Sequence, residues 1–194
     1  MHDRKPVRTV ISIGVKLGKD ADSEKVDDSM YRRLIGSLLY LTTSRPDILF
    51  VVSLLSRLIH SSRDTHFTTT KRVLRYIKRT NKFGTFFLVS VELTMNMVEY
   101  SNSDWGGRVD NSKSTYGYLF CVGTSCFIWS FRKQETTTKS TVETEYIVAP
   151  STMNQAIEVW KMLKDLSHEQ TEASKITCDY NSKVSISRNP VFHG

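Results

Sequence analysis

Oxygen-bearing side chains occur at three points in the second half of the chain where a strand or helix begins or ends. In YSNSDWGG, Asn102 and Asp104 are two residues apart and would share one face of an expected strand. Glu145 lies in STVETEY, at the start of an expected helix, and Asp179 ends an apolar strand in ITCDYNS. Acids at such positions could converge on a divalent metal, because Mg²⁺ takes oxygen ligands and phosphoryl-transfer sites often hold such metal ions.

Each of these acids also has an ordinary structural role available. Ser140 and Glu143 have the spacing of a capping box, so Glu143 is expected to cap the helix. Glu145 lies about 200° further around that helix, which leaves it able to face the sheet. Asp104 would equally suit a turn and Asp179 a helix cap. Spacing alone leaves both the metal cluster and the structural roles open.

A run of six cations without an acid lies near the middle of the chain. Its members are Lys71, Arg72, Arg75, Lys78, Arg79 and Lys82. On a helix, Lys71, Arg75, Lys78 and Lys82 fall near one edge, where they would meet the phosphates of a nucleic acid. The same pattern is typical of the solvated face of an amphipathic helix. Both interpretations are retained.

The elements that would position these residues follow from the apolar pattern. Helical spacing predicts three helices, which begin near Tyr31, at Pro46 and at about residue 64. Aromatic and β-branched runs then predict strands over residues 97–104, 116–122, 126–131 and 175–179. A helix over residues 141–166 separates the last two strands, and Pro150 is expected to break or kink it. This order predicts an α/β sheet that begins as an antiparallel meander.

Charge divides the chain at about the same place as the change in pattern. Residues 1–83 hold 17 Lys and Arg against 8 Asp and Glu, whereas residues 84–194 hold 10 against 12. The basic character therefore belongs to the first half alone. We expect a linker or disordered segment over residues 1–29, a small helical unit over 30–83 and an α/β domain over 84–194.

Composition excludes several classes of protein. The 194 residues are 39% hydrophobic and 24% charged, which is ordinary globular usage. No apolar run approaches ~20 residues and the first residues lack a signal-peptide pattern, so we expect an intracellular chain without a membrane partner. The three cysteines, Cys121, Cys126 and Cys178, form no CxxC pair and predict reduced thiols.

An ordered series of motifs is similar to a known family. The series is YRRLIGSLLYLTTSRPDILFVVSLLSR, KRVLRYIKRT, YSNSDWGG, KSTYGYLF, WSFRKQ, STVETEY, CDYNS and NPVFHG. From about Met30 to Gly194, the chain closely resembles the C-terminal part of the Pol polyprotein of copia-type LTR retrotransposons. The resemblance implies the end of a reverse transcriptase region, followed by a ribonuclease H-like mixed sheet that is truncated at its C-terminus.

The resemblance also implies a site. The family's ribonuclease H domain holds Mg²⁺ with four acids and cuts the RNA strand of an RNA–DNA hybrid. Glu145 and Asp179 match two of these acids and would be the metal ligands, while Asn102 occupies the position of the first and the fourth would lie beyond Gly194. Asp104 is a possible substitute for the replaced acid.

These departures imply weak or absent Mg²⁺ binding and an impaired or inactive nuclease. The expected partners are an RNA–DNA hybrid or another nucleic acid, bound through Lys71, Arg72, Arg75, Lys78 and Arg79, and the rest of a Pol polyprotein. Two alternatives remain at this point: a non-catalytic nucleic-acid-binding module, and a relic without function.

Overall fold

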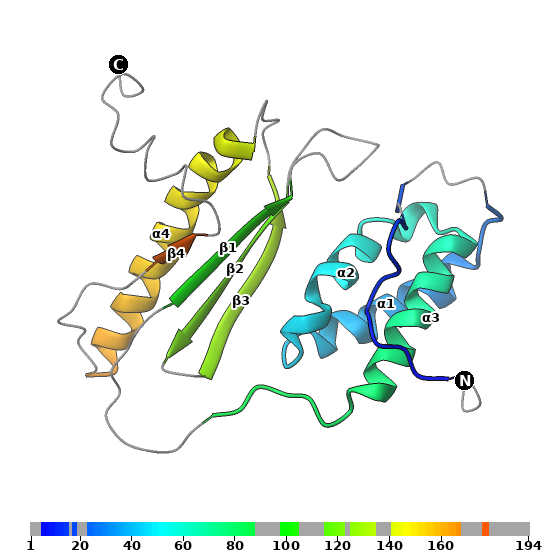
Figure 1. Cartoon of the computed structure of the whole chain (residues 1–194), viewed down its shortest axis with the longest axis horizontal. Helices are drawn as coiled ribbons and strands as arrows, with labels where there is room; N and C mark the ends of the chain where they lie inside the picture. The colour runs from blue at the N-terminus through cyan, green and yellow to red at the C-terminus, as the bar shows by residue number, and fades with distance from the viewer. Residues whose placement is uncertain are drawn as a thin grey trace. The chain divides into compact units, whose positions relative to one another are not determined.

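The computed structural model describes residues 5–15, 17–18, 23–87, 98–104, 115–122, 125–134, 141–167 and 176–178. These residues form two compact units, which we describe separately (Figure 1). The first, a helical unit, takes in the described residues up to Thr85. The second, a sheet unit, begins at Phe86.

The helical unit contains the three predicted helices. They are α1 (Asp28–Leu41), α2 (Pro46–Ser56) and α3 (Asp64–Arg79), with a short 3-10 turn over Ile59–Ser61 between the last two. The Asp27 carboxylate caps α1 by accepting a hydrogen bond from the Ser29 amide at 2.9 Å. Pro46 opens α2, as expected for a residue whose missing N–H costs nothing in the first turn. The helices enclose one apolar core, made of Leu17, Tyr31, Ile35, Leu38, Ile48, Val51, Val52, Leu55, Leu58 and Val73.

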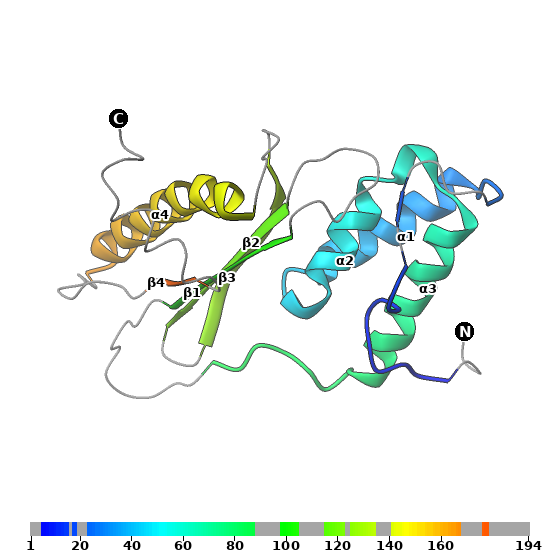
Figure 2. The same ribbon diagram turned by 45° about the horizontal axis from the view of Figure 1, so that its top comes forward.

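The N-terminal segment differs from the linker that the sequence suggested, because its described part packs on the helices (Figure 2). Leu17 is buried in the core, and the side chain of the buried His66 makes a hydrogen bond of 2.9 Å with the Gly18 carbonyl. Lys25 and Arg63 form an antiparallel bridge. Apolar burial and backbone hydrogen bonds therefore hold this segment, which its polar composition did not indicate.

The described residues of the sheet unit form four strands in the order β3-β2-β1-β4. Their bounds are β1 Val98–Asp104, β2 Thr115–Val122, β3 Ser125–Lys133 and β4 Ile176–Cys178. The first three form the predicted antiparallel meander, and β4 pairs parallel to β1. The described chain is thus a mixed α/β protein in which three helices precede the sheet in the sequence.

One long helix, α4 (Thr141–Asp165), packs on this sheet (Figure 2). Its Ala156 and Val159 form a small core with Tyr118 and Phe120 of β2. The expected break at Pro150 is wrong, since α4 is continuous through the proline. The loss of one backbone hydrogen bond is tolerated because packing of Ala156 and Val159 holds the turns that follow it.

The cysteines also correct a prediction. Cys121 and Cys126 form a disulfide between β2 and β3, where strand register places them directly opposite each other. The expectation of reduced thiols was wrong for this pair, because an odd cysteine count does not show which two residues a hairpin brings together. Among the residues described, no helix has the length and apolar character needed to cross a membrane.

Candidate functional site

Three of the predicted site positions lie on β1 and α4, two elements that contact each other. Asn102 and Asp104 belong to β1, where Asn102 pairs with Gly117 and Asp104 with Thr115. Glu145 is the fifth residue of α4, and α4 contacts β1. For these parts of β1 and α4, the structure describes the path of the backbone.

The third acid position follows β4. In the parallel ladder Ser101 pairs with Cys178, the last residue of β4. Asp179 comes next in the sequence and lies outside the described residues. Within the described part of the chain, no group of three His, Cys, Asp or Glu could hold a metal ion.

The basic residues of α3 differ in their partners and exposure. The Lys71 ammonium lies 4.0 Å from the centre of the Phe67 ring, and the Arg72 guanidinium donates to the Thr9 carbonyl and hydroxyl at 3.2 and 2.8 Å. Arg75 is half-buried. Lys78 and Arg79 are exposed in the last turn, and Lys82 is exposed just beyond it. The end of α3 is therefore the part of the predicted interface that solvent reaches most freely.

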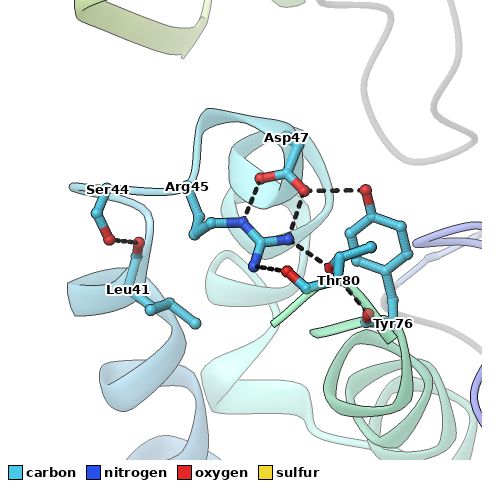
Figure 3. A network of polar contacts seen from close by, with 6 residues as sticks. All are labelled: Leu41, Ser44, Arg45, Asp47, Tyr76 and Thr80. Atoms are coloured by element: carbon cyan, nitrogen blue, oxygen red, sulfur yellow. Dashed lines mark hydrogen bonds and ion pairs between the residues drawn. The ribbon is translucent and has the colours of Figure 1, made fainter. Parts of the chain in front are cut away.

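A polar network that sequence reasoning missed joins the start of α2 to the end of α3 (Figure 3). The Arg45 guanidinium makes a bidentate pair with the Asp47 carboxylate, with N–O distances of 2.8 and 2.7 Å. It also donates to the Thr80 carbonyl at 3.0 Å and to the Thr80 hydroxyl at 2.6 Å. The Tyr76 hydroxyl donates to Asp47 Oδ2 at 2.9 Å. We call these four residues the Arg45 clamp.

Burial makes the clamp electrostatically strong. The side chain of Arg45 is 7% exposed and that of Asp47 is 31% exposed. Burial raises the pKa of Asp47, but hydrogen bonds from Arg45 and Tyr76 outweigh that effect, so the pKa lies below its ordinary value. The available sequence signal was an arginine directly before a helix-starting proline, together with Tyr76 in the last turns of α3 and Thr80 directly after that helix.

Comparison with known proteins places this mixed α/β chain in a family. It is 33% identical over 193 residues to the retrovirus-related Pol polyprotein from transposon RE2 of Arabidopsis thaliana. This match covers 100% of this chain and 13% of that protein. The chain is 30% identical over 200 residues to the Pol polyprotein from transposon TNT 1-94 of Nicotiana tabacum, covering 100% of this chain and 15% of the relative. The secreted RxLR effector protein 161 of Plasmopara viticola is 35% identical over 128 residues, or 66% of this chain and 89% of that protein.

The chain belongs to the copia-type retrovirus-related Pol polyproteins of transposons, which confirms the resemblance found in the motifs. It spans 13% of the length of the RE2 polyprotein and so fits a position within a larger polyprotein. No family model matches the chain. No solved structure matches it either.

Proposed function

We propose that the sheet unit is a ribonuclease H-like domain whose ligand is an RNA–DNA hybrid. The observation that carries this proposal is the parallel pairing of β1 with β4, in which Ser101 lies opposite Cys178. In the sequence, Asn102 follows Ser101 and Asp179 follows Cys178, and both match acid positions of the resembling family. Glu145 matches a third such position and belongs to α4, which contacts β1.

The donor set does not fit a site for two divalent ions. Asn102 offers one neutral carbonyl oxygen where a carboxylate would balance the charge of both cations. Asp104 lies about 7 Å further along β1, at ~3.3 Å per residue, so it does not occupy the same position. Glu145 and Asp179 carry carboxylates at the two other matched positions. We therefore propose weak or absent Mg²⁺ binding, and little or no hydrolysis of a hybrid.

The test is cleavage of a labelled RNA–DNA hybrid by the purified chain in Mg²⁺ or Mn²⁺. We expect no more than trace cleavage, whereas Asn102→Asp restores a carboxylate and is expected to tighten Mg²⁺ binding in isothermal titration calorimetry. Asp104→Asn is the matched control and should leave binding unchanged. Brisk metal-dependent cleavage by the unmodified chain would overturn the proposed impairment. Equal Mg²⁺ binding by the Asn102→Asp chain and the unmodified chain would show that residue 102 is not at a metal site.

A second candidate function is a nucleic-acid-binding module without catalysis. The observation that favours it is the exposed basic end of α3, because phosphate contacts supply most of the salt-dependent binding energy. Changing Arg75, Lys78 and Arg79 together to alanine should weaken binding to a duplex and flatten its salt dependence. Binding that ignores both salt and these changes would reject this candidate. A poorly folded relic would instead show no cooperative thermal transition by circular dichroism.

A further inference from the structure

A pocket of about 430 Å³ lies within the helical unit, beside the Arg45 clamp. Two short segments line it, residues 44–47 at the start of α2 and residues 82–85 after α3. Its volume is within the range of small-molecule sites in proteins. The pocket therefore has room for a flat ring together with a polar group.

The clamp fixes both walls of this pocket. Arg45 holds Asp47 on one side and both oxygens of Thr80 on the other. The Phe83 amide in turn donates to the Thr80 carbonyl at 2.9 Å, which closes the turn that carries Phe83. The segment after α3 is thus tied to α2 by hydrogen bonds, so the pocket is built before any ligand arrives.

The chemistry of the walls selects an anionic aromatic ligand. Phe83 is 63% exposed and lines the pocket, which leaves its ring available for stacking. The Asp47 charge is neutralised by Arg45, so Lys82 is the uncompensated charge of the lining. Lys78 and Arg79 add positive charge in the turn before it, and no acid occurs in residues 65–91. A phosphate joined to a nucleobase meets both requirements.

We propose that this pocket binds an unpaired nucleotide of a nucleic-acid strand, with its base stacked on Phe83 and its phosphate beside Lys82. A base inside a duplex is paired and stacked on both sides and cannot enter the pocket, whereas an unpaired base of a single-stranded segment can turn out and stack on the ring. This inference rests on the proposed nucleic-acid binding and specifies which form of strand the helical unit engages. A duplex that carries an overhang would contact the basic end of α3 and this pocket together.

The test compares the binding of two labelled probes to the full chain by fluorescence anisotropy. One is a blunt RNA–DNA hybrid, and the other is the same hybrid with a short oligothymidine overhang. We expect the overhang to tighten binding by about tenfold, as for one stacked base. Phe83→Ala should abolish that gain and leave the affinity for the blunt hybrid unchanged, whereas Phe83→Trp should keep the gain. Lys82→Ala should lower the salt slope for the overhang probe by about one.

Phe86→Ala is the matched control, because Phe86 is 73% exposed but does not line the pocket. The proposal would be overturned if Phe86→Ala reduced the affinity gained from the overhang as much as Phe83→Ala does. It would also be overturned if the overhang added no affinity while the blunt hybrid still bound. Failure of both probes, and of a single strand alone, would reject the proposed nucleic-acid binding as well. Circular dichroism melts of each variant establish that it is folded.

Discussion

The two units differ in how their interiors are held together. Among the residues that the structure describes, the helical core has ten buried apolar residues, from the N-terminal segment and from all three helices, and that of the sheet unit has four. The helical unit adds a buried polar clamp, whereas the one ion pair described in α4, between Lys161 and Glu158, is exposed. Within the described residues, the helical unit thus has the larger apolar core and the buried ion pair.

This difference bears on function. A helical unit with a full core and a clamp can present its basic end and its pocket as a fixed surface. The proposed nuclease site instead depends on β1, β4 and α4, which belong to the sheet unit. Loss of an acid at residue 102 would remove catalysis without affecting the surface of the helical unit. Nucleic-acid binding is thus the property that we expect to be retained.

The largest effect is expected at Phe120, which is fully buried between α4 and the sheet. Phe120→Ala should lower the free energy of unfolding of the sheet unit by about 3 to 5 kcal/mol through lost burial and the cavity left behind. Trp105, Trp129 and Trp160 are the tryptophans of the chain and all follow residue 86, so urea unfolding followed by tryptophan fluorescence reports on this unit.

Met162→Ala is the control for Phe120→Ala, because Met162 lies on α4 but is 61% exposed. The free energy of unfolding of the Met162→Ala chain, measured by fluorescence, should stay within about 0.5 kcal/mol of that of the unmodified chain. If the Phe120→Ala chain unfolded at the same urea concentration as the control, α4 would not be packed on β2.

A smaller effect is expected at the Arg45 clamp. Arg45→Ala leaves Asp47 partly buried without its guanidinium and removes both hydrogen bonds to Thr80. We expect a loss of about 2 to 3 kcal/mol, below the range for a fully buried pair because Asp47 keeps some contact with water. Circular dichroism at a helical wavelength during urea unfolding would measure it.

Glu158→Ala removes the exposed ion pair on α4 and should change stability by about 0.5 kcal/mol or less. If Arg45→Ala lowered the free energy of unfolding by no more than Glu158→Ala does, the clamp would not join α2 to α3. Arg45→Lys keeps the charge but not the planar fork, so its stability should fall between those of the Arg45→Ala and unmodified chains.

The sequence predicts the elements of both units well because their signals are local. Pro46 sets the start of α2, and periods of two and 3.6 residues separate strands from helices. The Arg45 clamp could not be predicted in the same way, since Arg45 and Thr80 are 35 residues apart. The packing of Leu17 on the helical core depends equally on contacts distant in the sequence.

The candidate site shows a similar division. Motif order identified the family and the positions of Asn102 and Glu145, but only strand pairing shows that β1 and β4 are neighbours. The disulfide between Cys121 and Cys126 depends on hairpin register, which spacing alone leaves undetermined. The roles of Lys71 and Arg72 depended on which partners the folded helical unit offers to them.

Apart from the control substitutions, the smallest effect concerns the pH dependence of the helical core. Burial raises the pKa of Tyr31 to about 12, against an ordinary value of 10.0, and its hydroxyl donates to the Leu55 carbonyl at 3.0 Å. The neutral phenol is favoured in the folded state, so its contribution is fully present below pH 10 and is lost as pH rises toward 12. Between pH 8 and 11 the helical unit should lose about 1 to 1.5 kcal/mol. Tyr31→Phe removes the titrating group, and its stability should fall less over that range in urea titrations followed by circular dichroism. Parallel curves for the Tyr31→Phe and unmodified chains would show that Tyr31 ionises as readily in the folded chain as in the unfolded one.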